Sequence, residues 1–337
     1  MTERSPQDPS SGERAASGPD PDPTRPGLQT FSLEGRRAPG LYLVGWVATV
    51  FGGGLLGAEI ATGSGGTGGL IVTVAGSLIL GLGLVAAAGA QGIERRDRED
   101  LRYRGPSPFL VFAAALVLTI LATVPLALAR ADPKTMFTIL VAVVLTDAIW
   151  IILIGLTVVG VGALRWTEIG PGIVGARPAR VVGDVLFGAL AALPVILVSG
   201  LLGSVLVRVV GVFPENPLPT PSGGGEVLLG LLAAVVIAPI GEEIFYRGFA
   251  TTAWAQASGP AVAIAKGALF FSVAHILTIG GQSFGEAAGS ALVAFLVRLP
   301  VGLALGWVFL RRDSLPASIA LHATYNGVVV LAAFATA

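Results

Sequence analysis

Cysteine is absent from the 337 residues, which excludes disulfides, thiolate metal sites and a cysteine nucleophile. Charge is also scarce, because Asp, Glu, Lys and Arg together make up only 12% of the chain. A typical soluble domain carries about 25% charged residues, so the composition excludes an ordinary soluble protein. The formal net charge of +0 gives no sign of a nucleic-acid partner, and we expect none.

Long apolar runs make up most of what is present. Hydrophobic residues form 53% of the chain, and the mean hydropathy is +0.80. Runs of about 20 residues with few charges are long enough to cross a hydrocarbon core of roughly 30 Å as helices. We therefore expect an all-α fold, a polytopic transmembrane helix bundle of about eight or nine spans. The apolar runs lie at residues 40–61, 67–93, 107–129, 136–164, 181–212, 226–256, 260–279, 286–310 and 314–335.

Three regions of the chain differ in composition. Residues 1–38 are rich in Pro, Ser, Gly, Asp and Arg and hold almost no apolar residue, so we expect a disordered cytoplasmic tail. Residues 39–212 form N-terminal transmembrane helices that carry isolated charges. After a Pro/Gly-rich segment, residues 226–336 hold nearly all the polar groups that lie inside apolar runs, and we expect the catalytic core there.

Basic residues fall mainly on alternate loops. The tail, the loops at 94–105 and 165–180 and the turn at 311–313 are rich in arginine, whereas "TGSGGT" and the loop at 213–225 contain no basic residue. Basic loops stay on the cytoplasmic side, so the pattern predicts a cytoplasmic N-terminus. Lysine supplies only two of the 21 basic residues, a bias typical of GC-rich bacterial genomes. We expect an integral protein of the bacterial cytoplasmic membrane.

Three charges interrupt the apolar run "VIAPIGEEIFYRGFA" at residues 236–250. A charged side chain near the middle of a membrane costs on the order of 2.5 to 3.5 kcal/mol, so this cluster needs partners or a function. Arg247 follows Glu243 by four residues, which is the spacing of an intrahelical ion pair, whereas Glu242 points about 100° away around the helix. We expect Glu243 and Arg247 to pair and Glu242 to stay available.

The two histidines of the chain, His275 and His322, both lie in apolar segments after the glutamates. Asn326 follows His322 by four residues and therefore shares its helix face. Counting about 1.5 Å per residue from the expected cytoplasmic helix ends places Glu242 at roughly 21 Å, His275 at roughly 22 Å and His322 at roughly 12 Å. We expect these three side chains to meet in one cavity inside the membrane.

A carboxylate and two imidazoles in such a cavity are the parts needed for hydrolysis. They provide a general base for water, a second proton-handling group and donors for a developing oxyanion. Glu242, His275 and His322 are also three suitable ligands for a catalytic zinc with an open fourth position. The residues alone leave both alternatives open, so the cofactor is a divalent metal such as zinc, or none.

Two further charges lie deep in the apolar runs, Asp147 and Arg298. We expect each to pair inside the bundle because an unpaired charge at this depth is costly. Arg298 is also a candidate for a place beside the catalytic cavity.

The polar segments resemble a known set of motifs. "EEIFYRG" is similar to EExxxR, "FSVAH" to FxxxH and "HATYN" to HxxxN, in this order along the chain. Residues 236–335 thus resemble the CAAX protease and bacteriocin-processing (CPBP or Abi) family of intramembrane endopeptidases. The resemblance implies that Glu242 and His275 activate water and that His322 and Asn326 stabilise the oxyanion, with Glu243 and Arg247 as supporting groups. The family is described both as metalloprotease and as glutamate-type, which leaves the cofactor open.

The resemblance implies hydrolysis of peptide bonds in a membrane-associated protein or peptide, so the expected partners are membrane lipid and such a substrate. Peptide maturation, self-immunity and regulated proteolysis are alternative roles. The alternative function is a membrane binding or immunity protein, or a transporter, that uses the same polar cavity without catalysis. A purely structural polar cluster is the third possibility.

Overall fold

The computed structural model describes residues 32–63, 66–128, 135–173, 175–212, 218–277 and 279–335. All the regular elements in these ranges are helices, and strands are absent from them. Eight helices or continuous helical runs in the described ranges are long and apolar enough to cross a membrane, so the expected all-α transmembrane bundle is confirmed. The predicted tail at 1–38 lies almost wholly outside the described residues, and the direction in which the bundle is inserted stays a prediction.

The N-terminal helices follow the expected apolar runs closely. Pro39 in the first turn starts the first helix, and Gly63, with φ of 58°, ends it in the left-handed region that glycine tolerates. Thr135 caps a later helix by accepting a hydrogen bond from the Thr138 amide. The elements are α1 (Pro39–Thr62), α2 (Gly66–Arg96), α3 (Pro108–Leu128), α4 (Met136–Ile154), η1 (Gly155–Val159), α5 (Trp166–Ile169) and α6 (Pro178–Val210).

The next crossing is one continuous helical run with two widened stretches. Its parts are α7 (Gly224–Leu231), η2 (Leu232–Ile237), α8 (Ala238–Glu243), η3 (Ile244–Thr251) and α9 (Thr252–Ser258). In η2 and η3 the backbone has π-helical hydrogen bonding, in which each N–H reaches back five residues, and α8 between them carries both glutamates at its end. Widened turns of this kind are frequent at functional sites.

The last three helices are α10 (Pro260–Ala274), α11 (Phe284–Arg312) and α12 (Leu315–Ala335). The expected span at 260–279 is wrong as a full crossing, because α10 has 15 residues and covers only about 22 Å at 1.5 Å per residue. The segment is apolar beyond Ala274, but the regular α-helix ends there and residues 275–277 form a turn. His275 therefore stands at the C-terminal end of a short helix.

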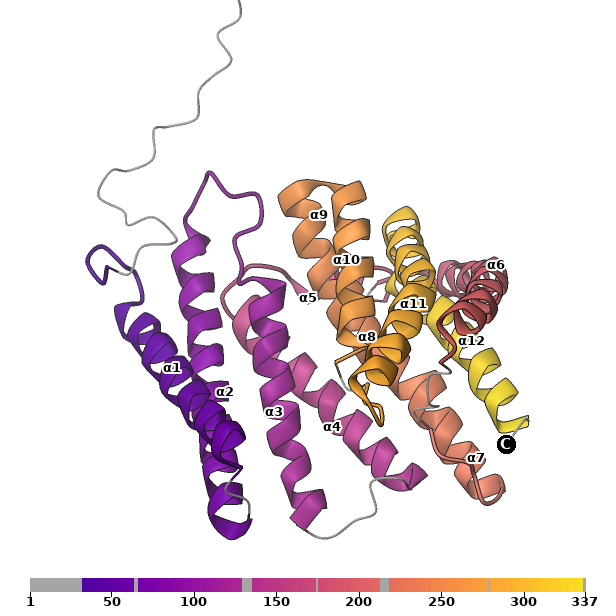
Figure 1. The fold of residues 1–337 in the computed structure, drawn as a ribbon. Coiled ribbons are helices and arrows are strands. Elements are labelled where there is room, and N and C mark those ends of the chain that lie inside the picture. The colour runs from indigo at the N-terminus through magenta and orange to yellow at the C-terminus, as the bar shows by residue number, and fades with distance from the viewer. Residues whose placement is uncertain are drawn as a thin grey trace, which may run out of the picture.

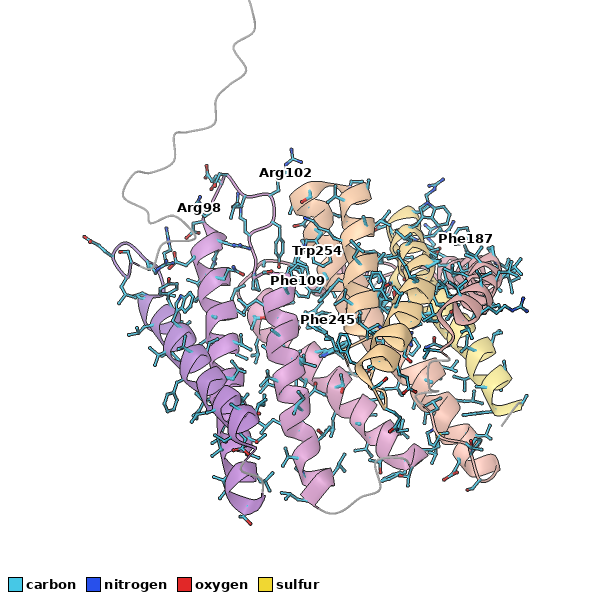
Figure 2. The ribbon with its side chains drawn as sticks, in the orientation of Figure 1. Arg98, Arg102, Phe109, Phe187, Phe245 and Trp254 are labelled. Carbon is cyan, nitrogen blue, oxygen red and sulfur yellow. The ribbon has the colours of Figure 1, made fainter. Side chains whose placement is uncertain are left out.

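The helices lie side by side in one bundle, with α1 and α2 at one edge and α6 and α12 at the other (Figure 1). The turn between α9 and α10 lies at the opposite end of the bundle from the C-terminus. Arg98 and Arg102 of the α2–α3 loop lie at the same end as that turn (Figure 2).

An aromatic cluster joins the N-terminal helices to the later ones. Phe112 of α3 contacts Phe270 of α10 with ring centroids 4.9 Å apart, and Trp150 of α4 contacts Phe245 of η3 at 4.8 Å. Figure 2 shows Phe245 in the interior of the bundle, between α4 and α10. Each such pair contributes about 0.5 to 1.5 kcal/mol beyond burial of its area. The cluster places α3 and α4 firmly against the run that carries the glutamates.

Candidate active site

The two adjacent glutamates have different surroundings. The side chain of Glu243 is fully buried, whereas that of Glu242 is 19% exposed. Consecutive residues on a helix point about 100° apart, so the two carboxylates face different neighbours. The site therefore has two parts, a buried Glu243 and a more accessible Glu242.

Glu243 is held by three side chains from two helical segments. Arg247 donates from Nη1 to Glu243 Oε1 at 2.9 Å, which is the ion pair expected from their spacing. Ser318 of α12 donates from Oγ to Glu243 Oε2. His322, also on α12, contacts Oε1 through Nδ1 at 2.8 Å. Both carboxylate oxygens are thus engaged, and Glu243 ties the α8–η3 run to α12.

Arg247 is satisfied in the same network. Its Nη2 donates to the Gly302 carbonyl of α11 at 3.5 Å, and its guanidinium carbon lies 4.4 Å from the ring centroid of Phe271 on α10. A side chain at Gly302 would collide with the backbone of Ala268, so glycine allows α11 and α10 to approach closely. Arg247 therefore fastens four helical segments together around Glu243.

The two histidines present the same ring nitrogen to Glu242. A carboxylate only accepts hydrogen bonds, so His322 donates to Glu243 from Nδ1. His275 likewise donates from Nδ1 to the Phe271 carbonyl at 2.7 Å. The Nε2 atoms of His275 and His322 then face Glu242 Oε2, at 3.5 and 3.8 Å. The structure thus brings together the three residues that were expected to share one cavity.

Glu242 Oε2 is buried and makes no hydrogen bond within the described part of the chain. Around it stand the Nε2 atoms of the two imidazoles, whose Nδ1 atoms are engaged with Phe271 and Glu243. Buried acceptors without a donor are costly, so this point of the structure suits a water molecule, which donates two hydrogen bonds.

The zinc alternative for Glu242, His275 and His322 receives no support from the placement of the side chains. In the described ranges, no group of three or more His, Cys, Asp or Glu side chains is arranged to hold a metal ion.

Asn326 is oriented differently from the expectation. Its Nδ2 donates to the Ala234 carbonyl of η2 at 2.8 Å, so the amide ties α12 to the widened turn before α8. Asn326 has the position in the chain that the resemblance requires. Within the described residues, the hydrogen bond of Asn326 to Ala234 joins two helices. A role for Asn326 in stabilising the oxyanion stays a prediction.

Three residues near the glutamates were missed or differently interpreted from the sequence. Ser318 was missed, although it precedes His322 by four residues and so shares its helix face.

Asp147 of α4 is buried beside Gly241, where an added Cβ would collide with the Asp147 carboxyl group. Asp147 also interacts electrostatically with Glu242. The expectation that Asp147 and Arg298 each form an ion pair is wrong, because neither has an oppositely charged partner within 4.0 Å in the described ranges.

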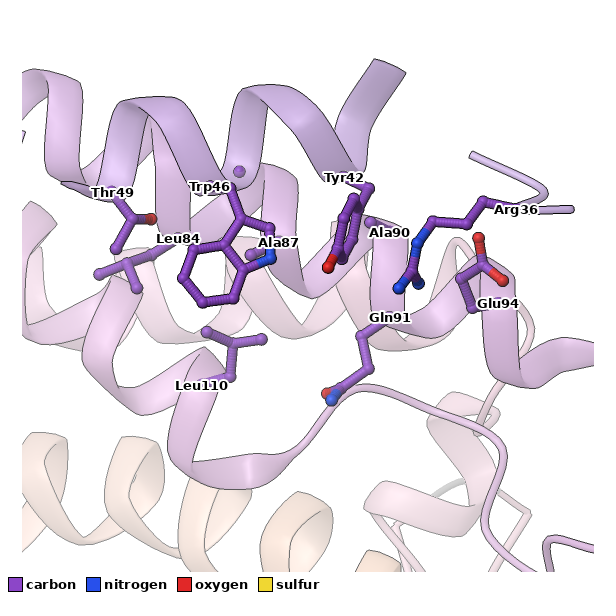
Figure 3. A pocket seen from close by; sticks show the side chains of 11 residues that line it. Arg36, Tyr42, Trp46, Thr49, Leu84, Ala87, Ala90, Gln91, Glu94 and Leu110 are labelled. Carbon is purple, nitrogen blue, oxygen red and sulfur yellow. The ribbon is translucent and has the colours of Figure 1, made fainter. Parts of the chain in front are cut away.

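A cavity of about 290 Å³ lies apart from this cluster, between α1, α2 and the start of α3 (Figure 3). Its charged and amide lining groups already have structural partners, whereas the buried Thr49 hydroxyl makes no hydrogen bond within the described residues. Gln91 accepts from the Ser107 amide, Glu94 accepts from the Arg37 amide, and Arg36 lies over the Tyr42 ring. None of the glutamate or histidine cluster lines this cavity, so the two features are separate.

The comparison with protein families covers the segment that carries the glutamate and histidine cluster. The family model of the type II CAAX prenyl endopeptidase Rce1-like proteins matches residues 224–328. This segment is Rce1-like. The Rce1-like segment covers under a third of the chain and contains all six expected site residues, namely Glu242, Glu243, Arg247, His275, His322 and Asn326. Neither the curated proteins nor the solved structures contain a match to the chain.

The match confirms the resemblance that the motifs indicated, and it implies protease activity. Together with the apolar helices it supports an integral membrane protein.

Proposed function

We propose that the protein is an intramembrane endopeptidase that hydrolyses a peptide bond with a water molecule activated by Glu242 and His275. The observation that carries the proposal is the arrangement at Glu242. Its buried Oε2 makes no hydrogen bond within the described chain and faces two imidazole nitrogens, at 3.5 and 3.8 Å, inside the Rce1-like segment.

The first step is attack by water on the carbonyl carbon of the substrate. Water bound between Glu242 Oε2 and His275 Nε2 gives one proton to the carboxylate as its oxygen forms the new C–O bond. The carbonyl oxygen then becomes an oxyanion. His275 is held by its hydrogen bond to the Phe271 carbonyl, so its ring is already oriented toward the water.

His322, on α12, stabilises the oxyanion. It donates from Nε2 only as an imidazolium, because its other nitrogen donates to Glu243. The Glu243 carboxylate stabilises that charged ring and fixes its orientation, as a buried carboxylate does behind a catalytic histidine. Arg247 and Ser318 keep Glu243 in place for this task. Asn326 Nδ2 donates one hydrogen to the Ala234 carbonyl, and its second hydrogen is a further donor for the oxyanion near His322.

The second step breaks the C–N bond. The proton held by Glu242 passes to the leaving nitrogen, which departs as an amine, and the acyl part departs as a carboxylic acid that loses its proton. One water is consumed for each bond cleaved, and Glu242 returns to the carboxylate. The substrate is a membrane-associated peptide or protein, and we place the reaction in the cytoplasmic membrane of a bacterium.

The test is cleavage of membrane peptides by the purified protein in detergent. Comparison of membrane and secreted peptides between cells with the wild type and cells with Glu242→Ala identifies the substrates. Glu242→Ala and His275→Ala should abolish cleavage while melting temperatures stay near the wild type. Removal of a general base slows a reaction by about 10²- to 10⁴-fold.

Glu226→Gln is a matched control because this carboxylate lies at the first turn of the same crossing, and it should keep full activity. Cleavage that survives both Glu242→Ala and His275→Ala would end the proposal. A lower melting temperature in these variants, with the cleavage rate of the folded protein unchanged, would support the purely structural alternative.

A further inference from the structure

Asp147 is a further carboxyl group in the membrane interior, on a helix that lies outside the Rce1-like segment. It stands 11 residues after Met136, where α4 begins, and 12 residues before Val159, where the helical run of α4 and η1 ends. At 1.5 Å per residue it is roughly 17 Å from either end, so its short side chain reaches neither interface. An ionisable group at this depth requires a partner or a function.

The partner of Asp147 is the backbone of Gly241 on α8. Asp147 is 8% exposed, and an added Cβ at Gly241 would collide with its Cγ and with both carboxyl oxygens. The carboxyl group therefore lies directly against the backbone, at a place where glycine has no side chain to prevent the contact. Gly241 makes a backbone hydrogen bond to this carboxyl group, and a backbone amide donates only through its N–H. Asp147 is thus the acceptor, and the contact joins α4 to α8.

The helical run around α8 depends on contacts from its neighbours. α8 has six residues and lies between two stretches of π-helical hydrogen bonding. Pro239 in its first turn has no N–H to donate to the helix. Asn326 of α12 supports the preceding stretch by donating to the Ala234 carbonyl of η2. Asp147 contacts the same run from α4, one residue before Glu242.

Glu242 lies between two residues that are held by different helices. Gly241 before it contacts Asp147 of α4, and Glu243 after it is bound by His322 of α12. Glu242 Oε2 makes no hydrogen bond in the described ranges. The backbone on either side therefore determines where this carboxylate stands relative to the two imidazoles.

We propose that Asp147 is a positioning residue for Glu242, and this rests on the proposed function. Through Gly241 it fixes the end of α8 against α4, so that Glu242 Oε2 stays 3.5 and 3.8 Å from the two imidazole nitrogens. A carboxyl oxygen accepts from an amide whether or not the group carries a proton, so this role does not require a charge on Asp147. Since α4 precedes the matched residues 224–328, the N-terminal helices contribute to the geometry of the active site.

The experiment compares two replacements of Asp147 that differ in their ability to accept a hydrogen bond. Asp147→Asn keeps a side-chain oxygen that can accept from Gly241, whereas Asp147→Leu has no acceptor. The matched control is Thr146→Val, because Thr146 donates to the Ala142 carbonyl of its own helix. With the full-length protein in nanodiscs, kcat and KM are measured on a membrane peptide that the wild type cuts. Hydrogen exchange of the α8 amides is followed by mass spectrometry on the same samples.

Asp147→Leu should lower kcat by about 10²-fold, the loss expected for a misplacement of about 1 Å. KM should stay nearly unchanged, because Asp147 does not touch the substrate. The α8 amides should exchange about 2- to 10-fold faster in Asp147→Leu, the range that corresponds to one hydrogen bond. Asp147→Asn and Thr146→Val should stay close to the wild type in kcat and in exchange.

The double variant Gly241→Ala/Asp147→Ala is a second test that serves even if Asp147→Leu does not fold. Its new methyl group fills the place of the removed carboxyl group, so stability should recover relative to Gly241→Ala. The link between α4 and α8 is still missing, so kcat should stay as low as in Asp147→Leu. A merely structural role for Asp147 would restore both quantities together.

Three results overturn the proposal. Asp147→Asn with a kcat as low as that of Asp147→Leu would assign the effect to the charge. Asp147→Leu with wild-type kcat or wild-type exchange of α8 would show that Asp147 does not position Glu242, and so would wild-type kcat in the double variant. If the wild type cleaves no peptide, the proposed function fails, whereas the exchange comparison still decides whether Asp147 holds α8.

Discussion

Replacing Arg247 by methionine should reveal how much the buried network contributes to stability. The Glu243 and Arg247 side chains are 0% and 1% exposed, and they are joined at 2.9 Å. Removing one partner of a buried pair leaves an uncompensated charge and costs about 3 to 5 kcal/mol. The lost contact between the guanidinium and the Phe271 ring adds about 0.5 to 2 kcal/mol.

The double variant Glu243→Gln/Arg247→Met separates stability from catalysis. It removes both charges of the Glu243–Arg247 pair, so most of the lost stability should return. Activity should stay low, because a neutral amide stabilises a charged His322 less than a carboxylate does.

The assay is SDS titration of the purified protein in mixed micelles, followed by tryptophan fluorescence, with cleavage measured on the same samples. Arg208→Met, which removes an exposed arginine in the last turn of α6, is the control for loss of an exposed cation. A loss below about 1 kcal/mol for Arg247→Met, or a double variant as unstable as the single one, would refute the reasoning.

Further predictions concern the surroundings of the two glutamates. Gly241→Ala should destabilise the protein by about 1 to 3 kcal/mol, because the new methyl group meets the Asp147 carboxyl group. The double variant Gly241→Ala/Asp147→Ala should recover most of that loss in the same titration, and additive losses would contradict the contact. Ser318→Ala should cost about 1.5 to 3 kcal/mol, the range for a hydrogen bond to a charged group, and Ser318→Thr should keep part of it; an unchanged midpoint in Ser318→Ala would exclude the bond to Glu243. Treatment with a zinc chelator should leave cleavage unchanged, whereas loss of activity that zinc restores would show that a metal acts at Glu242.

The membrane-spanning helices could be predicted from the sequence because hydrophobicity along one segment decides whether it crosses. The error at 260–279 has the same origin, since apolar residues continue after Ala274 although the helix does not. Hydropathy measures the composition of a segment and does not detect where a helix ends within an apolar run.

In the site, contacts within one helix could be predicted from the sequence, whereas contacts between helices could not. The pair of Glu243 and Arg247 follows from helical spacing, and it is present. The contacts of Ser318 and His322 with Glu243 depend on the register of α12 against α8, which helical periodicity does not define. Asn326 shows this most clearly. Its helix face was predicted, but its hydrogen bond to Ala234 depends on the widened turn in η2.

The central claim is that Glu242 activates the water that cleaves the peptide bond. Cleavage in H₂¹⁸O of a membrane peptide that the wild type cuts, followed by mass spectrometry, tests it most directly with the wild type and Glu242→Gln side by side. The wild type should place one ¹⁸O in the newly formed carboxylate, and Glu242→Gln should bind the peptide and yield no labelled product. Labelled product from Glu242→Gln at the wild-type rate would contradict the account.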